Sequence, residues 1–117
     1  MRTQPLILAL AVLGLAGCAN DPAPNEQMRI SEQALEQARA VGATDQAESL
    51  KLAEDKLARA RTNMLTEDYR DARMRAEQAE LDARFAEAQV LNQKSEEQLQ
   101  LLQSRVQRLR KQLEVQP

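Results

Sequence analysis

Hydrophobic residues recur at intervals of three and four in three segments of the chain, which predicts three amphipathic helices. The first segment runs from Glu26 to Val41, and Gly42 follows it as the expected C′ residue. The second runs from Gln46 to Met64. The third begins near Thr66, and no Gly or Pro interrupts it before Pro117. We therefore expect an all-α fold whose last helix is very long.

Each predicted helix has one apolar face, and the faces of the last two helices are rich in alanine. They consist of Ile30, Ala34, Leu35, Ala38 and Val41; of Leu50, Ala53, Leu57, Ala60 and Met64; and of Tyr69, Ala72, Ala76, Ala79, Ala83, Ala86 and Val90. Small side chains let helices approach closely, so the second and third helices are expected to form an antiparallel hairpin. The hairpin domain then covers residues 26–90, with the first helix preceding the hairpin itself.

The predicted helix ends carry capping signals. Asn25 is a candidate N-cap of the first helix, and Asp45, followed by Glu48, resembles a capping box for the second. The turn between the second and third helices is expected at residues 63–66.

The last part of the third helix has a different apolar seam, in heptad a and d positions. It consists of Leu99, Leu102, Val106, Leu109 and Leu113. Asn92 and Ser95 occupy the projected a and d positions just before it, so the apolar face moves around the helix after Val90. We therefore expect residues 91–117 to extend the helix as a coiled coil. The partner is a second copy or a different protein, unless the segment is a lone amphipathic helix.

Four basic residues accompany this seam: Arg105, Arg108, Arg110 and Lys111. They fit a solvated face beside a coiled-coil seam. They also fit contact with an anionic surface, such as lipid headgroups or envelope polymers.

The N-terminal segment has the features of a secretion signal. Arg2 precedes an apolar run from Leu6 to Ala16, which is shorter than the ~20 residues of a membrane-spanning helix. Cys18 follows this run and is the only cysteine, so it cannot form a disulfide within one chain. Residues 1–17 are thus expected to be a signal peptide, and residues 18–25, rich in Pro and Asn, a flexible tether.

The sequence Leu15-Ala16-Gly17-Cys18 resembles the lipobox of bacterial lipoproteins. The resemblance implies cleavage between Gly17 and Cys18 and a covalent diacylglycerol on the Cys18 sulfur. Two or more acyl chains hold a protein stably on a membrane. Ala19 follows in place of the Asp that retains many such lipoproteins at the inner membrane. The resemblance therefore implies the periplasmic face of the outer membrane.

The composition argues against catalysis. The chain has no histidine, 2% aromatic residues and a formal net charge of -2. Its serines lack a plausible base, and acidic pairs such as Glu54-Asp55 are expected on exposed helix faces. We expect no enzyme, no metal site, no cofactor besides the lipid, no nucleic-acid partner and no small-molecule substrate.

Residues 52–89 resemble a bacterial lipoprotein family known as domain of unknown function 4398. The matching positions are Lys56-Leu57, Ala60, Asp68-Tyr69, Ala72, Ala76, Ala79 and Asp82-Ala83. The resemblance implies a helical hairpin of the tetratricopeptide type. The family usually has Gly before the Asp-Tyr pair, whereas this chain has Glu67.

These observations favour a lipid-anchored structural protein that organises the cell envelope and self-associates through its C-terminal helix. The alternative is an adaptor that docks or regulates an envelope enzyme or a secretion or efflux machine. Some members of the resembled family carry a peptidoglycan-binding domain, so peptidoglycan, held without a covalent bond, is a further candidate partner.

Overall fold

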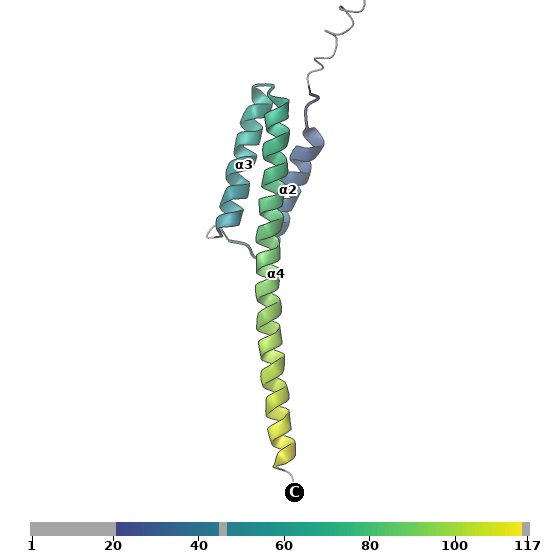
Figure 1. Ribbon diagram of the computed structural model, residues 1–117, viewed down its shortest axis with the longest axis vertical. Coiled ribbons are helices and arrows are strands. Elements are labelled where there is room, and N and C mark those ends of the chain that lie inside the picture. The colour runs from purple at the N-terminus through teal and green to yellow at the C-terminus, as the bar shows by residue number, and fades with distance from the viewer. Residues whose placement is uncertain (1–20, 45–46, 116–117) are drawn as a thin grey trace, which may run out of the picture.

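A computed structural model describes residues 21–44 and 47–115 of the chain, and this part folds into helices and loops (Figure 1). The helices are α2 (Asn25–Ala40), α3 (Glu48–Leu65) and α4 (Tyr69–Glu114). The 46 residues of α4 span about 69 Å at 1.5 Å per residue. The expected all-α fold with a very long last helix is confirmed. The predictions for Gly17, Cys18 and Asp45 lie outside the described residues.

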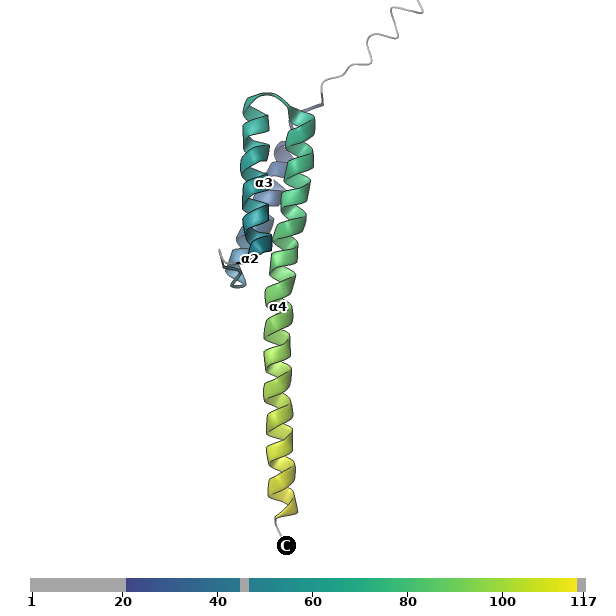
Figure 2. The same cartoon turned by 60° about the vertical axis from the view of Figure 1, so that its left-hand side comes forward.

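The three helices pack side by side at one end of the molecule (Figures 1 and 2). The chain runs in the same direction in α2 and α4, and in the opposite direction in α3. Both α2 and α3 contact α4, so the hairpin of α3 and α4 is completed by α2 as a three-helix bundle. The remainder of α4 projects beyond the bundle, and we call residues 91–115, which end at the C-cap Val115, the tail.

The core of the bundle matches the alanine-rich faces that the periodicity predicts. Its members on α3 and α4 include Leu50, Ala53, Leu57, Ala60, Ala76, Ala79, Ala83 and Ala86. Five buried alanines, Ala72, Ala76, Ala79, Ala83 and Ala86, form the alanine stripe of α4. Because none has a side chain beyond Cβ, two helices can lie close against α4 at once.

The buried face of α2 differs from the prediction at its edges. Ile30 and Val41 are only half-buried, whereas Met28 and Ser31 are buried. The hydroxyl of Ser31 lies 2.7 Å from the carbonyl oxygens of both Gln27 and Ala76, so its burial leaves no polar atom unsatisfied. The face turns towards Ser31 because α2 must contact α3 and α4 together.

The helix starts also differ from the prediction. Asn25 is the first residue of α2 and not its N-cap, which is Pro24. The carbonyl of Pro24 accepts a hydrogen bond from the Met28 N–H at 3.0 Å. α3 begins at Glu48, two residues later than predicted, with Ala47 as N-cap. Neither N-cap uses a side-chain hydrogen bond, so packing fixes these ends more than capping does.

Both α2 and α3 end in a Schellman motif. Gly42 has a φ of 107° at the end of α2, as the sequence predicts for a C′ glycine. At the end of α3 the same position is held by Glu67, with a φ of 60°. The Glu67 N–H bonds to the Met64 carbonyl at 3.3 Å, and the Asp68 N–H bonds to the Asn63 carbonyl at 2.9 Å.

The expected turn at residues 63–66 is therefore wrong. The helix α3 continues to Leu65, and a tight turn over residues 66–68 joins it to α4. Glu67 adopts a left-handed backbone conformation, which glycine adopts more readily than other residues. As a result, α4 begins at Tyr69 and not near Thr66, where the sequence predicted its start.

Candidate functional site

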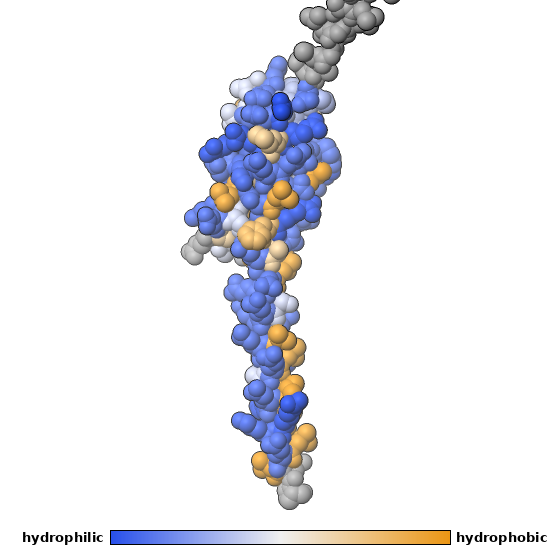
Figure 3. Space-filling model, in the orientation of Figure 1, coloured by the Kyte–Doolittle hydropathy of each residue, from blue (hydrophilic) through white to orange (hydrophobic). Residues whose placement is uncertain are grey.

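Apart from a hydrogen bond between Lys94 and the Val41 carbonyl, the tail is exposed throughout, and its hydrophobic side chains lie in solvent. The predicted seam residues are all exposed: Leu99 by 56%, Leu102 by 56%, Val106 by 46%, Leu109 by 58% and Leu113 by 73%. Figure 3 shows hydrophobic side chains along one edge of the projecting helix, on an otherwise hydrophilic surface. The seam is therefore an unpartnered apolar face.

The seam and the alanine stripe lie on nearly opposite sides of α4. At about 100° per residue, their midlines are separated by about 140° around the helix axis. The expected change of apolar face along the third helix is therefore present in the structure. The side of α4 that contacts α2 and α3 is therefore not the side on which the seam is exposed.

On the bundle part of α4, three hydrophobic residues outside the predicted faces are exposed. Met74, Leu81 and Phe85 lie on the bundle part of α4 and are exposed by 45%, 66% and 58%. Their burial state depends on where α2 and α3 sit around α4. In the sequence, only their spacing of seven and four residues indicates that they share one face of the helix.

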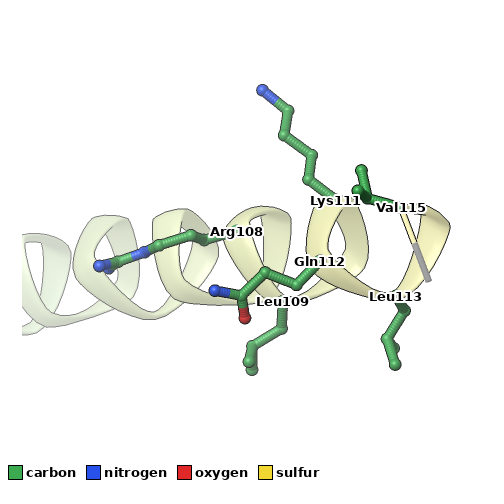
Figure 4. A pocket seen from close by; sticks show the side chains of 6 residues that line it. All are labelled: Arg108, Leu109, Lys111, Gln112, Leu113 and Val115. Carbon is green, nitrogen blue, oxygen red and sulfur yellow. The ribbon is translucent and has the colours of Figure 1, made fainter.

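The four basic residues of the tail do not share one face. Arg105, Arg108, Arg110 and Lys111 are all exposed, and their heptad positions g, c, e and f are spread around the helix. In Figure 4, Arg108 and Lys111 point in different directions. This arrangement fits charges flanking a coiled-coil seam better than a basic patch that lies flat on an anionic surface.

A hollow at the end of the tail offers no enclosed binding site. It is lined by Arg108, Leu109, Lys111, Gln112, Leu113 and Val115. Figure 4 shows Leu109 and Leu113 pointing to one side of α4, and Lys111 and Val115 to the other. All six residues belong to the end of one helix, so the hollow has a single wall until another chain covers it.

A second apolar area lies at the opposite end of the molecule. Met28, Met64 and Leu65 line a shallow hollow together with Asn25 and Arg61. Leu65 is 86% exposed. This end of the bundle is also where the chain enters α2 (Figure 1).

Ion pairs between helices cover the sides of the bundle. The Lys56 ammonium lies 2.5 Å from the Asp82 carboxylate and joins α3 to α4. Arg61 pairs with Glu32 at 2.8 Å and joins α3 to α2. Lys56 and Asp82 both belong to the sequence pattern of the resembled family. Their contact gives this part of the pattern a structural role.

The polar groups of the bundle serve the fold. Ser49 donates a hydrogen bond to the Gln89 side chain at 2.9 Å, and in the tail Ser104 donates one to the Leu101 carbonyl at 2.7 Å. At the start of α2, a hydrogen bond from Arg29 lowers the pKa of the Glu26 carboxyl, and both side chains are exposed. Within residues 21–44 and 47–115, no cluster of three metal-ligating side chains occurs.

A helix that spans a membrane needs about 20 consecutive, mostly apolar residues. None of the described helices is both long enough and apolar enough to cross a membrane.

Comparisons with known proteins agree with the resemblance read from the sequence. The family model described as "Domain of unknown function (DUF4398)" matches residues 26–102. A crystal structure of a DUF4398 family protein from Pseudomonas aeruginosa PAO1 is similar, with 63% sequence identity and a TM-score of 0.76. The similarity covers 79% of this chain and 96% of that one. No curated protein matches the chain.

Proposed function

Because this chain belongs to the DUF4398 family, whose function is unknown, we propose its role from its own surfaces. The proposed role is that of a lipid-anchored structural protein on the periplasmic face of the outer membrane. It organises the envelope by projecting a helical rod that self-associates through its tail.

The exposed leucine seam is the observation that carries this proposal. Its members, from Leu99 to Leu113, are between 46% and 73% exposed. A heptad seam of this kind is typical of a helix that pairs with another helix. A coiled-coil seam of fewer than about three complete heptads, such as residues 99–113, is marginal without a partner.

The geometry of the bundle is compatible with an anchor at Cys18. The chain enters α2 at the end of the molecule opposite the tip of the tail (Figure 1). Asn25 is the seventh residue after Cys18, so a lipid on Cys18 would hold this end within about 25 Å of the membrane. The exposed Leu65 would then face the membrane, and the tail would point away from it.

Self-association is tested by sedimentation equilibrium on residues 20–117, a fragment that contains the whole described core. We expect a concentration-dependent oligomer that Leu102→Asp and Leu109→Asp convert to a monomer, because a buried carboxylate opposes pairing. Leu101→Asp is the matched control, since Leu101 is 49% exposed on the same helix but lies off the seam. A wild-type fragment that stays monomeric at high concentration contradicts the proposal.

The anchor is tested separately in cells by labelling with radioactive fatty acid. Incorporation is expected in the full-length protein and should disappear in Cys18→Ser. Label that survives this substitution contradicts the lipoprotein assignment. By the resemblance to sorted lipoproteins, Ala19→Asp should move the protein to the inner membrane.

An adaptor that docks or regulates an envelope enzyme or a transport machine is the second candidate function. The exposed Met74, Leu81 and Phe85 on the bundle support it, since a folded partner could cover them. A monomeric fragment whose capture of one envelope protein depends on Leu81 would favour this role over self-association.

A further inference from the structure

The heptad frame of the leucine seam continues back into the bundle. Counting from Leu99 towards the N-terminus in alternating steps of four and three gives Ser95, Asn92, Ala88, Phe85 and Leu81. The next two positions are Gln78 and Met74. We call this continuous line from Met74 to Leu113 the outer stripe. The three exposed hydrophobic residues on the bundle part of α4, Met74, Leu81 and Phe85, all fall on it.

The outer stripe is open along its whole length. Its eight large apolar members, Met74, Leu81, Phe85, Leu99, Leu102, Val106, Leu109 and Leu113, are 45% to 73% exposed. On one flank of the stripe, Lys56 of α3 pairs with Asp82 of α4, which is at a heptad e position. On the other flank, the Gln27 amide of α2 donates a hydrogen bond of 2.7 Å to Glu80 of α4, which is at a c position. The a and d positions between these flanks face solvent.

We propose that the outer stripe is a single interface with a second copy of this chain, aligned parallel and in register. The coiled coil then begins on the outer face of the bundle and runs on into the tail. This inference rests on the proposed self-association and extends it to a surface that the tail alone does not include.

The length of the stripe favours one continuous interface. From residue 74 to residue 113 it covers nearly six heptads, or about 58 Å of helix. The tail's own seam is less than half as long. Pairing over the bundle removes Leu81 and Phe85 from water as well. Formation of one dimer would then bury every large apolar residue of the stripe.

The polar positions of the stripe favour a second copy as the occupant. Gln78 and Asn92 are at a positions, and Ser95 is at a d position. A parallel, in-register copy places each of them against its own counterpart, where amides and hydroxyls can hydrogen-bond each other. Polar a residues are known to fix the register of parallel dimers.

Other alignments lose this match. A parallel copy displaced by one heptad would place Asn92 against Leu99. An antiparallel copy that covers the whole stripe would pair Asn92 with Ser95, but it would bury Gln78 against Leu109. Each leaves amide groups against leucine, which costs free energy because the amide loses its hydrogen bonds to water.

The first test measures dimerisation of residues 20–117 with Leu81→Asp, a substitution in the bundle and outside the tail. We expect the dimer dissociation constant to rise about tenfold or more, as for a buried interface residue. Leu52→Asp on α3 is the matched control, since Leu52 is 44% exposed away from the stripe, and it should leave the constant unchanged. Circular dichroism should show unchanged helicity in both variants.

The outcomes separate this inference from the proposed function. If Leu102→Asp dissociates the dimer and Leu81→Asp does not, the outer-stripe interface is wrong while self-association through the tail stands. If the wild-type fragment is monomeric, both are wrong.

The second test fixes the alignment by disulfide formation. Residues 20–117 contain no cysteine, so Leu81→Cys introduces a single thiol at a d position. A parallel, in-register pair brings two such thiols together, and oxidation should give a covalent dimer, whereas Leu52→Cys should not. Cross-linking of Leu81→Cys to Val106→Cys in a mixture, without the Leu81 homodimer, would overturn the parallel alignment.

Discussion

The Lys94 ammonium group donates a hydrogen bond of 2.6 Å to the carbonyl oxygen of Val41. Val41 is the C-cap of α2, where backbone carbonyls lack partners within the helix. The positive charge also lies at the negative end of the α2 dipole. The first turn of the tail is thus tied to the end of the shortest helix, although 53 residues separate the two in sequence.

We expect Lys94→Met to lower the free energy of unfolding by about 0.5–1.5 kcal/mol, since it removes a charged hydrogen bond and a helix cap. Urea unfolding at one fixed protein concentration measures the change. Lys51→Met, on the exposed surface of α3, is the control and should have little effect. An equal loss in both variants would mean that the Val41 contact contributes nothing.

Replacing Glu67 with glycine is expected to stabilise the protein. A non-glycine residue in the left-handed region costs about 1–2 kcal/mol, and part of this is offset because glycine makes the unfolded chain more flexible. We expect a net gain of about 0.5–1 kcal/mol in Glu67→Gly, seen as a higher melting temperature. Glu67→Ala keeps the Cβ atom and should not show the gain. A lower melting temperature in Glu67→Gly would contradict the strained turn.

Two alanines on α4 are expected to respond oppositely to enlargement. Ala83 is fully buried in the alanine stripe, so Ala83→Leu should destabilise the bundle by about 1–3 kcal/mol through overpacking. Ala88 is exposed on the outer stripe, so Ala88→Leu should preserve the monomer and tighten the proposed dimer. Thermal unfolding and sedimentation measure the two effects. Equal destabilisation by both substitutions would contradict the assignment of the two faces.

The Lys56–Asp82 pair can be measured by a double-mutant cycle. Its side chains are 28% and 25% exposed, so a coupling energy of about 0.5–1 kcal/mol is expected between Lys56→Met and Asp82→Asn. The exposed pair of Asp55 and Arg59 on α3 serves as a comparison and should give only about 0.3–0.5 kcal/mol. A coupling energy no larger than that of the exposed pair would show that the Lys56–Asp82 pair contributes no more to stability than an ion pair on the surface.

Periodicity alone was sufficient for most of the bundle. Alanine at every interfacial position of the last helix, from Ala72 to Ala86, predicts close packing, and the structure buries all of these residues. Gly42 marked the end of α2 because few other residues adopt a positive φ without strain. These features could be predicted because each depends on local sequence and one neighbouring helix.

Features that depend on a third element were missed. Ser31 is polar, so a hydropathy pattern assigns it to solvent, yet the Ala76 carbonyl on α4 satisfies its hydroxyl in the core. The turn at Glu67 was missed for a different reason: glutamate rarely adopts a positive φ, and only the glycine that is usual in the resembled family points to one. The outer stripe was visible only in part, since Met74, Leu81 and Phe85 are separated by charged residues and their exposure follows from the position of α2 and α3.

The unbroken helix from Tyr69 to Glu114 makes the chain a molecular ruler. A rigid helix sets a fixed distance between the bundle and the tip of the tail, whereas a flexible linker would allow a broad range of distances. Each heptad added or removed changes this distance by about 10 Å and turns the seam by only about 20°. Evolution can therefore adjust the reach of such a protein in whole heptads while leaving its bundle and the direction of its seam almost unchanged.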